Sequence, residues 1–366
     1  MVAEYRTDQV GSLLRPPELL RARAAHKAGQ IDADELRRLE DEAILAALQM
    51  QREVGIAIFS DGELRRDAWM TDLADAVDGF VEHHRVMRWH RPDGGIEEEP
   101  SRAKVAGGKL RQHRRLAAHE AAFLKQQAPG PFKITMPSPA ASMFAAYVPG
   151  ISDAAYPTRF DFLTDLVAIV RGELQALVNE GVPYIQLDEG FTSYLGADWR
   201  ERMQRLGHDP DQTLVAAIAA ENACYDAVPR ERVTLGMHIC RGNSKSRWGQ
   251  SGGYDWLAEQ VFGSLHVDRF LLEYDSARAG SFAPLRFVPK GKTIVLGLIS
   301  TKTGELESQD ELLRRIEAAA RYLPLEQLAL SPQCGFASVD EGNLLTPDEQ
   351  RRKLELVVDT AREVWG

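Results

Sequence analysis

The segment Thr234-Leu235-Gly236-Met237-His238 is a short run of apolar and β-branched residues that ends in a polar side chain. Seven other segments share this pattern, and stretches with helical spacing lie between them. They are Arg6 to Ser12, Ile56 to Asp61, Phe132 to Pro137, Tyr184 to Asp188, Phe270 to Asp275, Thr293 to Ile299 and Gln327 to Ser331. Eight short strands alternating with helices predict an α/β fold, a (β/α)8 TIM barrel.

The predicted helices lie between these strands. They cover Asp32 to Val54, Arg159 to Glu180, Asp211 to Ala227, Gly253 to Phe262, Gln309 to Tyr322 and Thr346 to Trp365. The last has a clear start, because Thr346 can cap the helix and Pro347 suits its first position.

One interval, Thr71 to Pro131, is much longer than the others and predicts an insertion between the second and third strands. Its stretch Arg85 to Pro100 contains the acidic run Glu97-Glu98-Glu99, which is typical of a solvated hairpin or flap. We therefore expect residues 1–366 to form a single catalytic barrel domain, with a loop or hairpin insertion around 71–131.

The composition narrows the classes of partner. The formal net charge is -10 and both signs mix along the helices, which disfavours a nucleic-acid partner. No apolar run reaches the roughly 18 to 20 residues that span a bilayer, and the N-terminus has no apolar signal segment, so we expect a cytoplasmic protein without a membrane partner. The odd number of cysteines, 3, argues against a disulfide framework and favours metal or catalytic use of some of them.

Polar residues collect where the predicted strands end, and in a barrel the carboxyl ends of the strands form the active-site rim. Along the chain they are Gly11, Ser12, Asp61, Glu63, Ser138, Asp188, Glu189, His238, Cys240, Glu273, Asp275, Ser300, Lys302 and Cys334. Burying this many ionisable groups costs a few kcal/mol each when they lack partners, so the pattern indicates a polar site.

Four of these rim residues match the ligand preferences of zinc. His238 and Cys240 lie two apart, and strand alternation points both toward the barrel axis. Glu273 and Cys334, at two later strand ends, complete a tetrahedral set of nitrogen, sulfur and oxygen donors. Cys224 lies on the buried face of a predicted helix and is interpreted as a core residue.

Two thiolate ligands make a softer and less acidic zinc ion than the histidine-rich sites of hydrolases. Hydrolysis by a metal-bound water stays open, but such an ion is better suited to holding a substrate thiol as a thiolate. The thiolate is the nucleophile in sulfur alkylation.

Several blocks together resemble the cobalamin-independent methionine synthase family. They are Leu235 to Asn243, Leu272 to Asp275, Ser331 to Phe336, Val10 to Ser12, Asp61 to Glu63 and Gln186 to Glu189, and the match covers nearly the whole chain. The resemblance implies a zinc-dependent S-methyltransferase of methionine biosynthesis, which transfers the methyl group of 5-methyltetrahydrofolate to homocysteine.

The resemblance also assigns roles to single residues. It implies that His238, Cys240, Glu273 and Cys334 bind the zinc ion. It further implies that Glu63 and Asp188 hold the ammonium group of homocysteine, while the backbone near Gly11 and Ser12 takes its carboxylate.

Three departures from the family pattern concern the methyl donor. The chain has the length of one barrel where full-length members have two. Full-length members have a proton-donating histidine after the seventh strand. Lys302 is the residue nearest to that position in this chain, and we therefore assign it a catalytic role. The segment after Asp188 lacks the family's glutamate that contacts the pterin, so we expect methyltetrahydrofolate to be a poor donor, and a methylated corrinoid protein is an alternative.

Two other functions fit part of this sequence pattern. The single-barrel pattern also looks like the alkyl coenzyme M transferases, which open epoxides with a zinc-bound thiol that carries a sulfonate. Glu63 and Asp188 favour an amino-acid thiol, because two carboxylates attract an ammonium group and repel a sulfonate. A purely structural zinc site would not explain the polar rim beyond the four ligands.

Overall fold

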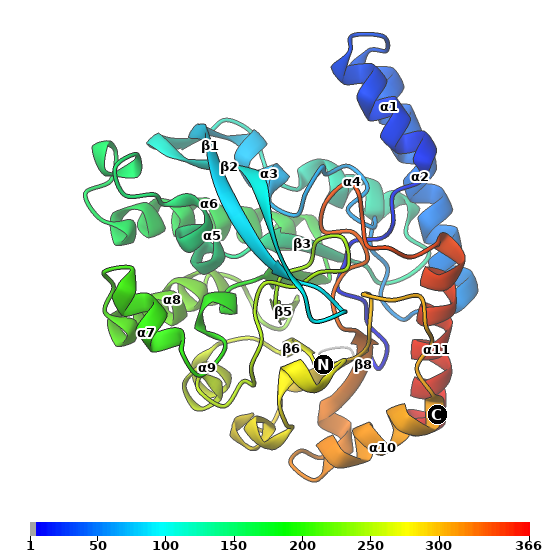
Figure 1. The fold of residues 1–366 in the computed structure, drawn as a ribbon. Helices are drawn as coiled ribbons and strands as arrows, with labels where there is room; N and C mark the ends of the chain where they lie inside the picture. The colour runs from blue at the N-terminus through cyan, green and yellow to red at the C-terminus, as the bar shows by residue number, and fades with distance from the viewer. Residues whose placement is uncertain (1–4) are drawn as a thin grey trace.

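A computed structural model describes residues 5–366 and contains a six-stranded parallel sheet. Its strands are β3 (Lys133–Pro137), β4 (Tyr184–Asp188), β5 (Thr234–Ile239), β6 (Arg269–Glu273), β7 (Thr293–Ile299) and β8 (Leu328–Pro332), paired in chain order. Helices lie around the outside of this sheet (Figure 1). The arrangement is the predicted α/β TIM barrel.

The first two predicted strands complete the barrel as single bridges. Thr7 forms a parallel bridge with Leu330 of β8, and Phe59 forms one with Phe132 just before β3. Between these two segments, side chains take the place of ladder bonds, since the Ala57 amide donates to Thr7 Oγ1 over 2.9 Å. The predicted strands Arg6 to Ser12 and Ile56 to Asp61 are thus too irregular to be continuous strands, although they occupy the expected places.

The helices fill the intervals between the strands. They are α1 (Pro17–Lys27), α2 (Ala33–Val54), α3 (Thr71–Ala76), α4 (Ala118–Gln127), α5 (Pro139–Ala146), α6 (Arg159–Glu180), α7 (Trp199–Arg205), α8 (Pro210–Tyr225), α9 (Ala258–Ser264), α10 (Gln309–Ala320) and α11 (Pro347–Trp365). The predicted cap of α11 is confirmed, because Thr346 accepts from the Glu349 amide in a capping box. Within residues 5–366, no helix is long and apolar enough to cross a membrane.

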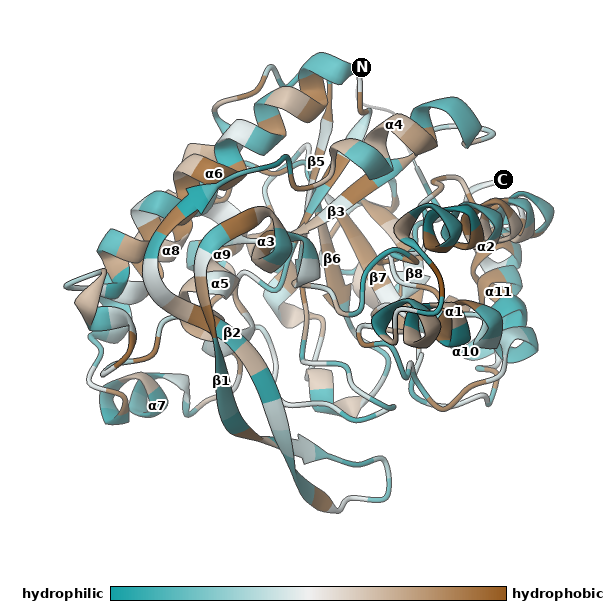
Figure 2. Cartoon of the chain, turned by 90° about the horizontal axis from the view of Figure 1, so that it is seen from above, coloured by the Kyte–Doolittle hydropathy of each residue, from teal (hydrophilic) through white to brown (hydrophobic). Residues whose placement is uncertain are grey.

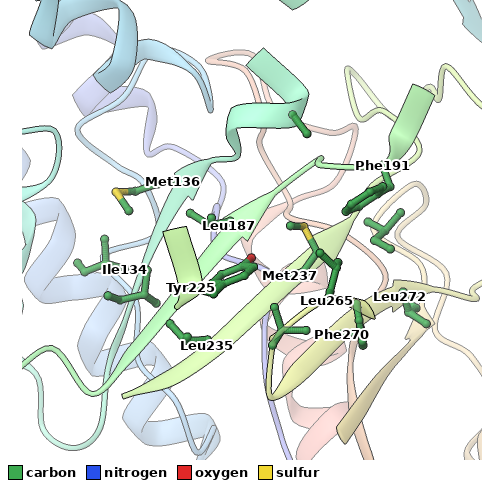
Figure 3. Close-up of a cluster of buried hydrophobic side chains, with 14 of the residues drawn as sticks. Ile134, Met136, Leu187, Phe191, Tyr225, Leu235, Met237, Leu265, Phe270 and Leu272 are labelled. Atoms are coloured by element: carbon green, nitrogen blue, oxygen red, sulfur yellow. The ribbon is translucent and has the colours of Figure 1, made fainter. Parts of the chain in front are cut away.

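Strand alternation separates an apolar outer layer from an inner layer that is polar on β3, β4 and β5 and partly apolar on β6, β7 and β8. Figure 3 shows outward residues gathered around Tyr225 of α8: Ile134, Met136, Leu187, Leu235 and Met237. The alternate residues Lys133, Gln186 and His238 point the other way and are equally buried. In Figure 2 the strands of the sheet are largely brown, the colour of hydrophobic residues, whereas the helices around them alternate between hydrophilic and hydrophobic residues. The same periodicity that builds the core thus places polar groups along the barrel axis.

The insertion is a long antiparallel hairpin, formed by β1 (Val77–His90) and β2 (Ile96–Gln112). It lies between the second barrel segment and β3, as the sequence predicts, and extends away from the barrel in Figure 2. Its end returns to the rim, where the backbones of His90 and Trp248 exchange hydrogen bonds of 2.7 and 3.1 Å. The hairpin is therefore attached to the loop that follows β5.

Candidate metal centre and substrate site

The structure brings together the four residues predicted to bind zinc. His238 lies in β5, Cys240 directly follows β5, Glu273 ends β6, and Cys334 follows β8. One ligand atom from each lies within 4.8 Å of the other three, and all four side chains are buried. The two sulfur atoms are 3.6 Å apart. The cluster could hold a metal ion.

Neighbouring groups orient these donors toward one point. The Nδ1 atom of His238 lies 3.1 Å from the Leu271 carbonyl, and its Nε2 atom is buried without a hydrogen-bond partner among residues 5–366. Glu273 Oε1 accepts from the Arg241 amide over 2.7 Å, and the Gly242 amide lies 3.2 Å from Cys240 Sγ. A histidine anchored through one nitrogen with the other unsatisfied is what a metal ligand requires. The donor set of nitrogen, two sulfurs and carboxylate oxygen fits zinc.

Neighbouring groups favour the ionised forms of Glu273 and Cys334. Burial raises the pKa of Glu273, but Lys302 and Arg278, with smaller effects from His238 and Arg241, outweigh it and lower the pKa. Arg278 also donates to Glu273 Oε2 over 3.3 Å. The hydrogen bond with Cys240 lowers the pKa of the Cys334 thiol, so Cys334 is the readier thiolate of the pair.

The residues assigned to the amino-acid substrate lie beside the cluster. Asp188 pairs in register with His238, and both are buried at the rim. Glu63 is also buried and accepts a 3.0 Å hydrogen bond from Thr135 Oγ1. A Cβ atom at Gly11 would stand 2.5 Å from Glu63 Oε1, so only glycine lets this carboxylate approach the first barrel segment.

Ser12 joins the residues predicted to bind the substrate to the candidate metal cluster. Its carbonyl accepts from the Phe336 amide over 2.8 Å, and a Cβ atom at Gly335, next to Cys334, would lie 1.9 Å from Ser12 Oγ. The structure thus gathers Gly11, Ser12, Glu63 and Asp188 on the side of the rim where Cys334 and His238 lie.

Opposing effects act on the pKa of the Asp188 carboxyl group. Burial raises the pKa of its carboxyl to about 7, whereas the charge of His238 and the hydrogen bond from Gln186 act in the opposite direction. That hydrogen bond joins Gln186 Nε2 to Asp188 Oδ1 over 2.7 Å. A bound ammonium group would favour the ionised form further.

Lys302 is buried. It is therefore not a solvated lysine of a surface loop. Its Nζ atom donates to Asn243 Oδ1 and to the carbonyls of Arg247 and Gly242, the last two over 3.1 and 3.4 Å. Burial lowers its pKa, although Cys334 and Glu273 oppose this. The lysine therefore joins the loop after β5 to the loop after β7.

A cleft of about 670 Å³ lies beside the centre, between the hairpin and the loops after β4 and β5. Glu189 and Gly242 line it from the rim, and Arg85 and Trp89 line it from β1. Glu189 has a left-handed backbone with φ of 66°, which no sequence pattern signalled. Desolvation raises the pKa of its carboxyl to about 7, and a hydrogen bond with Cys240 acts against this.

The hairpin's acidic run is largely exposed, as expected, but two of its residues also form ion pairs across the rim. Glu97 pairs with Arg247 over 3.0 Å, and Glu99 pairs with Lys245 over 2.9 Å and also with Arg247. Both cations belong to the loop after β5, far away in sequence, so local composition could not reveal the pairing.

The fold and site together define a barrel enzyme with a candidate metal centre at the carboxyl ends of its strands. The model of the family described as "Cobalamin-independent synthase, Catalytic domain" matches residues 5–363. The chain belongs to this family, the cobalamin-independent methionine synthases, and the family implies a methyltransferase.

Individual relatives agree with this membership. The chain is 39% identical to the uncharacterized protein YxjH of Bacillus subtilis, over 99% of this chain and 95% of that protein. It is 26% identical to a methionine synthase of Pyrococcus abyssi, with 91% and 87% of the two chains covered. A Listeria monocytogenes protein described as a candidate vitamin-B12 independent methionine synthase superposes with a TM-score of 0.74 and 32% identity, over 100% and 99% of the two chains.

Proposed function

We propose that this protein is a zinc-dependent methyltransferase that converts homocysteine to methionine. The observation that carries the proposal is a buried four-donor cluster beside the buried carboxyl group of Asp188, which in turn lies near the buried Glu63. A metal site next to paired acids suits a substrate that has both a thiol and an ammonium group.

His238, Cys240, Glu273 and Cys334 would hold the zinc ion. When bound, zinc supplies the Lewis acidity that keeps the substrate sulfur deprotonated at neutral pH. Methyl transfer then forms a bond from sulfur to the methyl carbon and breaks the bond from that carbon to the donor. The electron pair of the broken bond leaves with the donor, and the thiol proton is released to solvent.

The protein's own groups would orient the acceptor. Glu63 and Asp188 supply charge-assisted acceptors for the ammonium group, and the backbone near Gly11 and Ser12 takes the carboxylate. This charge pattern also favours homocysteine over coenzyme M, because a sulfonate at the same place would meet two carboxylates without a compensating partner.

The methyl donor would enter through the cleft beneath the hairpin. The cleft adjoins Glu189 and Gly242, whose neighbours in sequence and space include Cys240. Its volume of about 670 Å³ falls in the range of small-molecule sites. Lys302 is the candidate proton donor. Its Nζ atom donates to three acceptors, which restrict its movement, and we therefore expect methyltetrahydrofolate to be used inefficiently.

The proposal is tested by offering the zinc-loaded protein homocysteine or coenzyme M and recording proton release on binding. Methionine formation is then measured with methyltetrahydrofolate, a methylated corrinoid protein and simple methylated sulfur compounds as donors. Homocysteine-dependent proton release and methionine formation are expected. Preferential use of coenzyme M would replace this function with the alkyl coenzyme M transferase alternative.

A further inference from the structure

A buried polar chain runs along the barrel axis beneath Asp188. Its members are Asp8 of the first barrel segment, Lys133 of β3 and Gln186 of β4, and each is at most 1% exposed. Burying an ammonium group and an amide together is costly unless every donor finds an acceptor, so the contacts among them are informative.

Lys133 fixes the orientation of the Gln186 amide. The Lys133 Nζ atom donates to Asp8 Oδ1 over 2.8 Å, to Gln186 Oε1 over 2.7 Å and to the Gln9 carbonyl. An ammonium group has three hydrogens and accepts nothing, so the atom of Gln186 that faces it must be the oxygen. The oxygen and nitrogen of a glutamine amide are otherwise hard to distinguish, but the contact with Lys133 determines which atom is which.

The NH₂ end of Gln186 consequently faces the rim. It donates to the Val10 carbonyl and to Asp188 Oδ1, each over 2.7 Å. This bond holds Asp188 Oδ1 as an acceptor, because a proton on that oxygen would meet the amide hydrogen, and it fixes the direction of the carboxyl group. Asp188 can then offer its other oxygen to a donor on the substrate.

We infer that Lys133 and Gln186 are positioning residues that hold Asp188 as a hydrogen-bond acceptor and so set the preference for a thiol bearing an ammonium group. This inference rests on the proposed function, in which Asp188 binds the ammonium of homocysteine. Neither residue touches the substrate. They act through Asp188, from inside the barrel.

Gln186→Glu tests the chain with little change of shape. One carboxylate oxygen keeps the bond from Lys133, but the other becomes an acceptor that faces Asp188 Oδ1 at the position of a 2.7 Å contact. Gln186→Met removes the donor without adding charge and covers the case in which the first variant fails to fold. Tyr184→Phe is the matched control, since it deletes a 3.1 Å bond to Asp8 in the same buried layer and leaves the amide in place.

The measurement compares two thiols by calorimetric titration of the zinc-loaded full chain: homocysteine, and 4-mercaptobutanoate, the same chain without the ammonium group. The parent should prefer homocysteine. In Gln186→Glu and Gln186→Met the ratio of the two affinities should fall by about 10- to 150-fold, which is the factor expected for the loss of one charge-assisted hydrogen bond. Binding of 4-mercaptobutanoate and zinc content should stay at parent levels, and Tyr184→Phe should keep the preference.

The outcomes separate the inference from the function beneath it. A parent that binds both thiols equally overturns the amino-acid acceptor and, with it, this inference. A parent that prefers homocysteine, together with Gln186 variants that keep the same preference, overturns the positioning role alone. Equal weakening of both thiols in these variants also overturns it, because that result indicates general structural damage.

Discussion

Replacing Glu63 with glutamine should weaken homocysteine binding while leaving the site's shape intact. Glu63 is 4% exposed, so water screens little of the charge of its carboxylate. Its Oε1 accepts the 3.0 Å bond from Thr135, which a glutamine oxygen can retain. The amide nitrogen of the new side chain would then face the substrate ammonium, donor against donor.

The size of the effect follows from the contact that is lost. A hydrogen bond between ionised partners contributes about 1.5–3 kcal/mol, so the Kd for homocysteine should rise about 10- to 150-fold. Gly11→Ala should have the same direction of effect by another route, because its new Cβ atom would stand 2.5 Å from Glu63 Oε1 and displace the carboxylate.

The assay is calorimetric titration with homocysteine and 4-mercaptobutanoate, accompanied by zinc analysis. Glu120→Gln is the matched control, since Glu120 bonds Arg66 over 2.9 Å and Arg66 also contacts Glu63, yet Glu120 has no assigned substrate role. The control should change stability more than the ratio of the two affinities. An unchanged Kd for homocysteine in Glu63→Gln, or equal weakening of both thiols, would refute the reasoning.

Further predictions concern the metal, the donor and pH. Metal analysis should find about one zinc per chain, lost in Cys240→Ser and Cys334→Ser but kept in Cys224→Ser; full zinc in both ligand variants would contradict the assigned cluster. Steady-state kinetics should show methyltetrahydrofolate to be a poor donor, and an efficient folate reaction that proceeds unchanged in Lys302→Ala would contradict this. Burial raises the pKa of Glu221 to about 7 from its usual 4.5, so the native state retains a proton that the unfolded state loses between these values. The free energy of unfolding should therefore fall with rising pH through about 7, by at most about 3 kcal/mol relative to Glu221→Gln, and parallel denaturation curves for the two proteins at all pH values would disprove it.

Periodicity made much of the architecture predictable. The strand from Thr234 to His238 and the helix from Arg159 to Glu180 agree closely with β5 and α6, because alternation with period two and spacing near 3.6 are local properties. The segments around Thr7 and Phe59 were placed correctly but form only single bridges. The Thr7 hydroxyl and the Gln51 amide oxygen accept hydrogen bonds from backbone N–H groups there in place of ladder carbonyls, and strand propensity does not predict such bonds.

The sequence likewise predicts only part of the candidate site. Strand ends and residue chemistry were enough to select His238, Cys240, Glu273 and Cys334 as candidate ligands, although roles for the substrate residues came from the family resemblance. The sequence predicts that Glu189 lies at the rim but gives it no role. Neither its positive φ nor the hairpin opposite it can be predicted from neighbouring residues.

The sequence by itself determined the alternation of strands and helices, the polar rim and the types of donor atom gathered there, since each follows from residues a few positions apart. Only the tertiary structure decided which distant groups meet. It places Cys240 beside Cys334, 94 residues away, buries Lys302 under the loop after β5, and joins Glu99 of the hairpin to that loop. It also orients Gln186 through Lys133, because the direction of an amide depends on the donor that the folded chain brings against it.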